Sequence, residues 1–246
     1  MNYQPREFWD QRLAEHFDLR GTGETGLSLA YNRACYALRR DVLDHALRDA
    51  GIDPRGRRVL DVGCGAGFFT AYYLARGARV TGIDITPTSV ERLSARHPEA
   101  TFILADVSEH PIAGHFDVVN AFDVLYHITD DARWETALRH LGDAVVPGGA
   151  LLVTDAFTDM GAVAEHNRMR PLERWQAVLG PMGFTFAPLR ATAVLLNRDL
   201  GPWRFLNRAP GVLKALDRAL LAAGVGSGPR WHGRTFNRLL VARKRG

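Results

Sequence analysis

The stretch Val59-Leu60-Asp61-Val62-Gly63-Cys64-Gly65-Ala66-Gly67-Phe68-Phe69-Thr70 decides the fold of this chain. An apolar run with one acid leads into three glycines spaced by two, and apolar residues then return at helical spacing. We interpret this pattern as a buried strand, a tight turn without side chains, and a helix whose N-terminus faces the turn. A flat ligand can lie directly on a glycine backbone, and the free N–H groups of the helix start supply hydrogen bonds to it. The stretch therefore predicts a site for a nucleotide-like ligand.

Size and composition fit one α/β domain with an attached cap. The chain has 246 residues, of which 46% are hydrophobic, and this is enough to build a core. No apolar run approaches the ~20 residues that cross a bilayer, and the polar N-terminus is not a signal peptide, so we expect no stable membrane insertion. Two cysteines, Cys35 and Cys64, are too few for a disulfide framework, which favours a reduced, cytoplasmic setting. The net charge of +4 comes from scattered residues, so a nucleic-acid partner is not expected.

The chain alternates strands and helices from about residue 58 onward. Apolar strands separated by helices imply a parallel sheet that is covered on both faces, with ligands at the carboxyl ends of its strands. The predicted strands are 58–62, 79–84, 101–105, 116–122, 149–156, 184–196 and 235–242. The predicted helices after the first strand are 67–76, 87–96, 130–146, 172–179 and 212–223.

Two helices are predicted before the first strand, over 4–19 and 28–50. We therefore divide the chain into an N-terminal helical cap, 1–56, and a main domain, 57–246. Within the main domain, 156–182 and 199–230 are predicted to be lid segments over the substrate, because long connections between late strands often form lids or interfaces.

The glycine spacing decides between nucleotides. A dinucleotide fingerprint needs its third glycine at position 68, which is Phe68, and no lysine follows the turn as a P-loop requires. S-adenosylmethionine (SAM) has no phosphates; it needs backbone for its methionyl part, acids for its ammonium and ribose, and a polar group for adenine. Asp61 lies just before the turn, Asp84 ends the second strand where an acid can bind ribose hydroxyls, and Asp106 follows the third strand.

Five motifs resemble those of class I SAM-dependent methyltransferases of the small-molecule type: VLDVGCGAG (59–67), VTGIDIT (80–86), ADV (105–107), FDVVNAFDVLYHI (116–128) and PGGALLVTD (147–155). The resemblance implies a Rossmann-like, doubly wound α/β fold with a seven-stranded, mostly parallel sheet, an antiparallel last strand and a helical insertion before it. It implies SAM as the cofactor and S-adenosylhomocysteine as its product. The residues expected to bind the cofactor are Trp9, Tyr31, Asp61, Gly63, Gly65, Gly67, Asp84, Ile85, Asp106, Val107 and Phe122.

Two histidines are candidates for catalysis. A hydroxyl acceptor benefits from a general base, and both His127, after the fourth strand, and His166, after the fifth, can take a proton near neutral pH. Asp155 or Asp159 can orient such a histidine. The alternatives are that His127 is a structural residue of the sheet rim and that methyl transfer relies on proximity alone.

The remaining motifs narrow the reaction. Metal-dependent members carry an Asp-Asn pair after the fifth strand, whereas Asp155 here precedes Ala156, so we predict no metal. The segment 120–123 lacks the Asn/Asp-Pro-Pro-aromatic motif of nucleic-acid amino methyltransferases. We expect a monomer or homodimer that methylates a small molecule at oxygen in secondary-metabolite, sugar or lipid tailoring. The alternatives are N- or C-methylation, a non-methyl reaction such as cyclisation, and a non-catalytic partner subunit.

Overall fold

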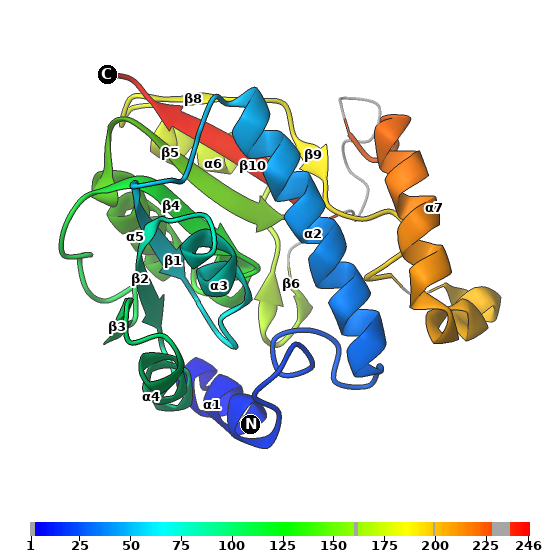
Figure 1. Cartoon of the computed structure of the whole chain (residues 1–246). Helices are drawn as coiled ribbons and strands as arrows, with labels where there is room; N and C mark the ends of the chain where they lie inside the picture. The colour runs from blue at the N-terminus through cyan, green and yellow to red at the C-terminus, as the bar shows by residue number, and fades with distance from the viewer. Residues whose placement is uncertain (1–2, 160–161, 199, 228–236) are drawn as a thin grey trace.

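The protein is described by a computed structural model that covers residues 3–159, 162–198, 200–227 and 237–246. Its centre is an eight-stranded sheet of order β3-β2-β1-β4-β5-β10-β8, with β9 paired to β10 (Figure 1). Strands β1 to β5 are parallel, and β10 runs antiparallel to β5. The predicted Rossmann-like fold with an antiparallel last strand is confirmed. The strands are β1 (Arg58–Val62), β2 (Arg79–Asp84), β3 (Thr101–Leu104), β4 (Phe116–Phe122), β5 (Val145–Asp155), β8 (Phe184–Phe186), β9 (Arg190–Ala191) and β10 (Arg238–Lys244).

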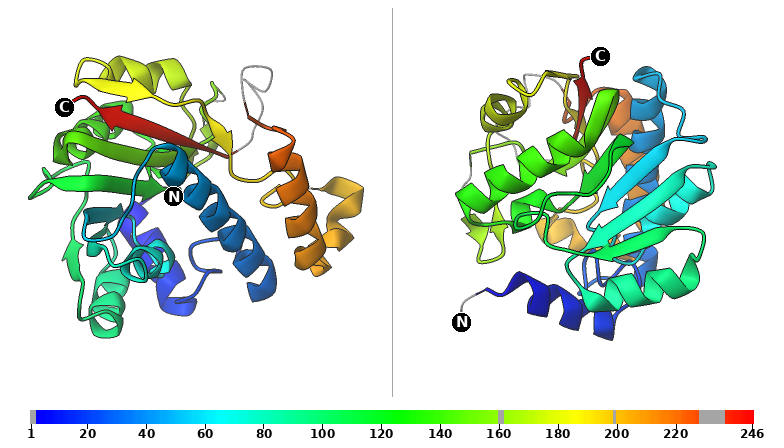
Figure 2. Two further views of the ribbon diagram at one scale, coloured as in Figure 1. Left: turned by 45° about the horizontal axis from the view of Figure 1, so that its top comes forward. Right: turned by 90° about the vertical axis from the view of Figure 1, so that its left-hand side faces the viewer.

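Helices cover both faces of the sheet (Figure 2). On one face α2 (Leu29–Asp49) and α3 (Phe68–Leu74) share a buried apolar cluster with β1, β4 and β5, and on the other α5 (Asp131–Ala144) and α6 (Leu172–Leu179) do the same. Helix α4 (Pro87–Arg96) packs beside β2 and β3, and α1 (Pro5–Glu15) packs against α4. The 3-10 helix η2 (Gly201–Arg208) and α7 (Pro210–Ala222) form the insertion before β10. The burial of α2 against the sheet makes this predicted cap helix part of the main core.

Local sequence explains where the helices begin. The side chain of Ser28 accepts a hydrogen bond from the N–H of Tyr31 at the start of α2, and Asp130 caps α5 in the same way. Thr86 caps α4, whose first residue is Pro87. Each cap satisfies an N–H group that the helix itself leaves unpaired.

Several predicted boundaries are wrong. Helix α1 ends at Glu15 and not at residue 19. Strand β5 begins at Val145 and not at residue 149, because the Pro-Gly-Gly segment continues the strand, with a register shift against β4. The predicted strand 184–196 is interrupted, since the N–H groups of residues 194–196 donate to the buried carboxylate of Asp217 in α7 instead of pairing in the sheet. Residues 235 and 236 of the predicted last strand lie outside the described residues.

The segment after β5 is more ordered than its sequence suggested. It forms a two-stranded hairpin from β6 (Ala162–Ala164) and β7 (Asn167–Arg168), and η1 (Leu125–His127) contacts β7. The hairpin thereby reaches the carboxyl edge of the sheet near β4. Within the described ranges, no helix combines the length and apolarity that crossing a bilayer requires.

Candidate functional site

A cavity of about 560 Å³ opens at the carboxyl ends of the parallel strands. Its lining includes residues 63–66 after β1, 84 and 85 at the end of β2, 105–108 after β3, and 122–124 after β4. The strand order reverses here, because β1 pairs with β2 on one side and with β4 on the other. Such a switch point leaves a crevice between diverging loops, and ligands of open α/β sheets bind there.

The glycine turn lets backbone form part of the cavity wall. Gly63 and Gly65 have φ angles of +66° and +49°, which side-chain-bearing residues rarely adopt. A Cβ on Gly63 would lie 2.4 Å from Val124 Cγ2, and one on Gly65 would lie 2.5 Å from Thr22 Cγ2. Both positions therefore require glycine, for conformation and for space.

Gly67 lies apart from the cavity wall and packs between helices. It is the left-handed N-cap of α3, and a Cβ there would lie 2.5 Å from Leu93 Cδ2 of α4. It does not line the cavity. The third glycine thus serves helix packing, and its contact with the ligand stays a prediction.

Asp84 anchors the turn from the end of β2. One carboxylate oxygen accepts the N–H of Gly65 at 2.8 Å, and the other accepts the N–H and hydroxyl of Thr86 at 2.9 and 2.7 Å. The side chain is buried, which raises the pKa of its carboxyl, while these hydrogen bonds oppose the rise. Asp84 therefore holds an acceptor in a fixed position at the cavity wall, and the remaining lone pairs of the carboxylate can accept hydroxyl groups.

Asp61 lies behind the turn in a buried network. Its carboxylate accepts the hydroxyl of Thr70 at 2.7 Å and the amide of Asn120 at 2.9 Å, so it ties β1 to α3 and β4. Burial raises the pKa of Asp61 to about 6 despite both hydrogen bonds. Asp61 also lines the cavity, and the network positions its carboxylate there.

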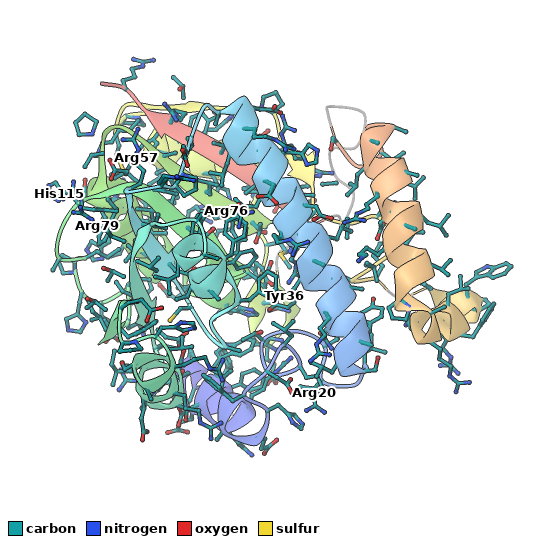
Figure 3. The ribbon with its side chains drawn as sticks, in the orientation of Figure 1. Arg20, Tyr36, Arg57, Arg76, Arg79 and His115 are labelled. Carbon is teal, nitrogen blue, oxygen red and sulfur yellow. The ribbon has the colours of Figure 1, made fainter. Side chains whose placement is uncertain are left out.

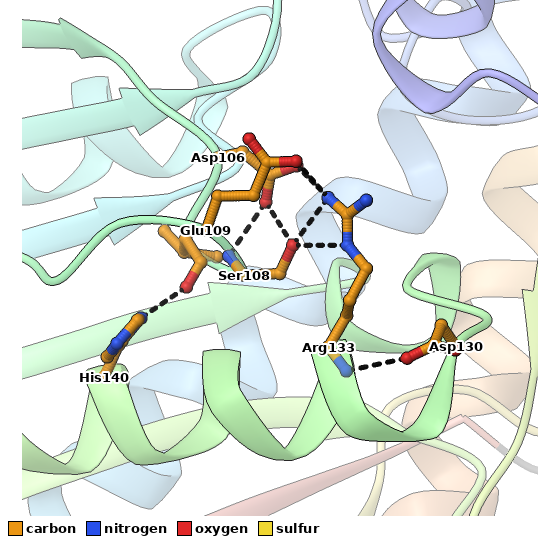
Figure 4. A network of polar contacts seen from close by, with 7 residues as sticks. Asp106, Ser108, Glu109, Asp130, Arg133 and His140 are labelled. Carbon is orange, nitrogen blue, oxygen red and sulfur yellow. Dashed lines mark hydrogen bonds and ion pairs between the residues drawn. The ribbon is translucent and has the colours of Figure 1, made fainter.

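Asp106 belongs to a polar network at the β3 end of the cavity (Figure 4). One of its oxygens accepts the N–H and hydroxyl of Ser108, and the other accepts Arg133 Nη2 at 2.8 Å. Arg133 also contacts Glu109, and His140 Nδ1 donates to the carbonyl of Val107. The loop after β3 is therefore braced from α5. Ile85, Val107 and Phe122, also predicted to bind the cofactor, line the same cavity.

Aromatic rings from α1 and two loops form the opposite wall. Trp9 meets His127 edge to face with centroids 4.7 Å apart, and His166 stacks on Phe8 at 5.3 Å and lies parallel to His127 at 5.7 Å. The Trp9 indole N–H donates to the hydroxyl of Tyr3. Trp9 and both predicted catalytic histidines thus meet in one cluster that lines the cavity.

The environment of His127 determines its protonation. Burial lowers its pKa to about 4, so the ring is neutral at pH 7. Nδ1 lies 2.9 Å from the carbonyl oxygen of His166, and because a carbonyl can only accept, Nδ1 carries the proton. Nε2 then holds the lone pair, which is the tautomer that a general base needs. The pKa of about 4 makes His127 a weaker base than the near-neutral value expected from the sequence. Burial also lowers the pKa of His166.

Tyr31 is not among the residues that line the cavity, and its predicted contact with the cofactor stays a prediction. It is 1% exposed and packs with Leu38, Leu196 and Leu213, while its hydroxyl accepts the N–H of Asn197. Helix α2 rotates it away from the sheet edge and toward α7.

Sequence reasoning missed Tyr36 and Arg39 of α2, which do line the cavity. Tyr36 lies on the side of α2 toward α3 (Figure 3), and its hydroxyl donates to Thr22 Oγ1 at 2.8 Å. Arg39 forms a buried ion pair with Asp123 at 2.9 Å. The available signal was Arg39 itself, a charged residue one helical turn from Tyr36 on a face that is otherwise buried.

Asp123 organises the end of the cavity beyond β4. It adopts a positive φ of 59°, and its carboxylate accepts hydrogen bonds from Thr154 and Asn237 in addition to the ion pair with Arg39. The Oδ1 of Asn237 is buried without a hydrogen-bond partner among the described residues, and Asn237 lines the cavity. This end is therefore polar and partly unsatisfied.

The two segments predicted to be lids differ in their position relative to the cavity. The segment 156–182 contributes Ala156, His166, Asn167 and Met169 to the cavity wall. The described part of 199–230 contributes none, and its Trp203 is 63% exposed. Across the described ranges, no group of three or more His, Cys, Asp or Glu side chains has an arrangement that could hold a metal ion.

The residues present fit a nucleoside joined to an amino acid. Three kinds of surface follow one another around the sheet edge. They are the bare backbone at Gly63 and Gly65, the fixed acceptor of Asp84, and the apolar side chains of Ile85 and Val107. The backbone suits a zwitterionic chain, the carboxylate suits vicinal hydroxyls, and the apolar pair suits a flat base.

Comparisons with known proteins agree with this geometry. Residues 59–149 match the methyltransferase domain family. A ubiquinone biosynthesis O-methyltransferase of Pseudomonas aeruginosa is 36% identical over 118 residues, which cover 44% of this chain and 50% of that protein. The chain thus spans about half the length of the curated relatives it matches.

Solved structures share the fold over most of the chain. Magnesium protoporphyrin IX methyltransferase from Synechocystis PCC 6803, solved with bound SAM, has a TM-score of 0.61 and 19% identity, and the match covers 97% of this chain and 94% of that one. The 4+2 cyclase SpnF has a TM-score of 0.54 and 21% identity, with 83% and 80% coverage. At these identities the likeness concerns the fold alone.

Proposed function

We propose that this chain, which belongs to the class I SAM-dependent methyltransferases, transfers a methyl group from SAM to a small-molecule acceptor and releases S-adenosylhomocysteine. The observation that carries the proposal is that one cavity joins the glycine turn, Asp84 and the aromatic wall. The family match over 59–149 and the methyltransferase among the structural neighbours support it.

Cofactor binding is assigned to the sheet edge. The backbone at Gly63 and Gly65 would receive the methionyl part, and Asp84 would accept both ribose hydroxyls, because its carboxylate is held by Gly65 and Thr86. Ile85 and Val107 would flank the adenine, with Asp106 as the acceptor for its amino group. Asp61, which Thr70 and Asn120 hold in place, would offer its carboxylate to the ammonium group.

When bound, SAM supplies a methyl group on a sulfonium, which is already a good leaving group. The protein's task is then to align the acceptor and exclude water. Trp9, His127 and His166 close one side of the cavity, and Phe122 ends β4 beneath it. His127 would take the proton from an acceptor hydroxyl at Nε2, since its Nδ1–H is held by the carbonyl of His166.

An oxygen acceptor fits the cavity best. A neutral histidine with a free Nε2 serves a hydroxyl or phenol, whereas an amine needs no base once it is neutral. The polar end formed by Arg39, Asp123 and Asn237 offers donors and an unsatisfied acceptor to further oxygen substituents. The name of the ubiquinone biosynthesis O-methyltransferase relative supports the same choice.

Direct assay with isotopically methyl-labelled SAM tests this proposal. The purified chain should release S-adenosylhomocysteine and label hydroxylated aromatic or polyhydroxylated small molecules. In single turnover with saturating SAM, His127→Gln should slow transfer by about 100-fold, because general-base catalysis typically contributes 10²–10⁴-fold. His166→Gln serves as the matched control, since it leaves the carbonyl that holds His127 in place.

Each outcome has a defined meaning. Calorimetry that detects no S-adenosylhomocysteine binding would refute the cofactor assignment. Label on nitrogen or carbon would replace the O-methyl assignment, and product formed without S-adenosylhomocysteine would indicate a reaction such as the cyclisation named for the structural neighbour SpnF. Full transfer rates in both histidine variants would mean that proximity alone drives transfer.

A further inference from the structure

Exposed apolar side chains gather on the insertion before β10. Trp203 and Phe205 of η2 are 63% and 55% exposed, and Val212 and Leu216 of α7 are 55% and 47% exposed. These are four of the six large hydrophobic residues that are exposed in the described part of the chain. In Figure 3 the side chains of η2 extend outward at the right-hand edge of the molecule, away from the sheet. We call these four residues the insertion patch.

Helix α7, which carries part of the insertion patch, is anchored by buried contacts. Leu213 of α7 is fully buried against α2 in the cluster that contains Tyr31 and Leu38. Asp217, one turn further on, is also fully buried, and its carboxylate accepts three backbone N–H groups from residues 194–196. The outward face of α7 is therefore fixed in place while its apolar side chains face solvent.

The exposed charged side chains of the insertion itself are basic. Between residues 201 and 222 the acidic side chain is Asp217, which is buried and engaged. The basic side chains are Arg204 and Arg208, which are exposed, Lys214, which is half-buried, and Arg218, which pairs with Asp41. The solvent-facing surface of the insertion is thus apolar and positive, with no exposed acid among these residues.

This combination fits a membrane surface. Tryptophan and phenylalanine enter the boundary between headgroups and acyl chains, and arginine and lysine contact anionic headgroups above it. A second copy of the same patch would bring positive charge against positive charge across a two-fold axis. Val212 and Leu216 are aliphatic and have no rings to stack on nucleic-acid bases.

We propose that the insertion patch docks this protein on membranes that contain anionic lipid, as a peripheral contact. The cavity does not include the patch, so docking is independent of the proposed methyl transfer. Membrane docking would give the η2–α7 insertion a role, since none of its described residues lines the cavity.

Vesicle sedimentation with the full chain tests the proposal, with no cofactor or acceptor present. The protein should sediment with vesicles of phosphatidylcholine and phosphatidylglycerol in a ratio of about 70:30, and much less with phosphatidylcholine alone. Raising the salt concentration should weaken the binding, because it screens charge.

Two variants separate the apolar and charged contributions. Arg204→Glu/Arg208→Glu should lower the partition coefficient by about thirty-fold or more, because each basic residue near an anionic surface contributes about fivefold. Trp203→Ser/Phe205→Ser should lower it by at least about tenfold through lost interfacial burial. Arg57→Glu/Arg139→Glu, at 57% and 50% side-chain exposure elsewhere on the surface, makes the same charge change and should have little effect.

Several results would overturn the proposal. The wild-type protein could fail to bind anionic vesicles, or both insertion variants could bind as tightly as the wild type. The Arg57/Arg139 control could also lose as much vesicle binding as the Arg204/Arg208 variant. A wild-type dimer that Trp203→Ser/Phe205→Ser converts to monomer, measured by light scattering, would identify a self-association face instead. Thermal unfolding and S-adenosylhomocysteine binding by each variant show that the fold and the cavity are intact.

Discussion

Gly63→Ala tests why position 63 carries glycine. Either the turn conformation alone requires this residue, or the neighbouring Val124 also leaves no room for a side chain beside the cavity. Gly63 has φ +66°, and its added Cβ would lie 2.4 Å from Val124 Cγ2. The chain offers a matched control in Gly51, which has φ +65° and nothing within 4 Å of an added Cβ. Comparing the two alanine variants separates the cost of the backbone conformation from the cost of the contact.

The two costs can be estimated separately. A non-glycine residue in the left-handed region costs roughly 1–2 kcal/mol, and both variants bear this cost. At Gly63 the overlap with Val124 also forces a shift in a packed region, and overpacking of this kind typically costs about 1–3 kcal/mol. We therefore expect Gly51→Ala to lower the free energy of unfolding by about 1–2 kcal/mol, and Gly63→Ala to lower it by about 2–5 kcal/mol.

Denaturant unfolding and calorimetry with S-adenosylhomocysteine measure both effects. Gly63→Ala should weaken binding at least about tenfold, because a misplacement of about 1 Å at a positioned site can cost 10²-fold. Gly51→Ala should bind as the wild type does. Adding Val124→Ala to Gly63→Ala removes Cγ2 and should recover part of the lost stability, which gives a negative coupling energy in a double-mutant cycle.

One result would refute this reasoning. If Gly63→Ala matches Gly51→Ala in both stability and ligand affinity, the contact with Val124 has no measurable cost and Gly63 serves the turn conformation alone.

Four further predictions concern other parts of the site. Asp84→Asn should weaken S-adenosylhomocysteine binding by about 10–100-fold in calorimetry, because it removes charge-assisted hydrogen bonds, and unchanged affinity would exclude a ribose contact. The pKa of His127 is lowered from 6.5 to about 4, so the unfolded chain takes up this proton at higher pH than the folded chain does. The free energy of unfolding should therefore fall by about 3 kcal/mol as the pH drops from 6.5 to 4. His127→Gln should lack this slope in denaturant titrations. Burial raises the pKa of Asp155 to about 7, so stability should fall by up to about 4 kcal/mol as the pH rises from about 4 through 7, and an Asp155→Asn variant with an equally steep pH profile would contradict this. Tyr31→Phe should lower the free energy of unfolding by about 1 kcal/mol, because it removes the acceptor for the Asn197 N–H, and should leave ligand affinity unchanged. Weaker ligand binding by this variant would indicate that Tyr31 contacts the cofactor.

The parts of the fold that sequence reasoning predicted best are those with strong local patterns. The strands 58–62, 79–84 and 116–122 have the predicted bounds because each is a short apolar run between clear turns. The strand predicted over 184–196 was wrong for a non-local reason, since Asp217 of α7 takes the N–H groups of 194–196. No pattern within 184–196 indicates that a carboxylate 21 to 23 residues further along the chain will accept these N–H groups.

The candidate site divides in the same way. Asp84 and the glycines were identifiable because their spacing within one strand–turn–helix unit implies the geometry. Tyr31 and Tyr36 are both aromatic residues of one helix, and only the rotation of α2 on the sheet decides that Tyr36 faces the cavity and Tyr31 faces α7. That rotation depends on the whole buried cluster, which the helical sequence does not contain.

The sequence by itself determined the glycine turn, the acids at the strand ends and the alternation of strands and helices, because these follow from backbone conformation and short-range periodicity. Tertiary structure alone decided that Gly67 packs on Leu93, that Arg39 pairs with Asp123, and that the carbonyl of His166 holds the proton of His127 in place. Contacts of this kind join segments far apart in the chain, and their free energy depends on burial and on partners that no single segment encodes. The glycine turn predicted where a ligand lies; the packing around it decides which side chains the ligand meets.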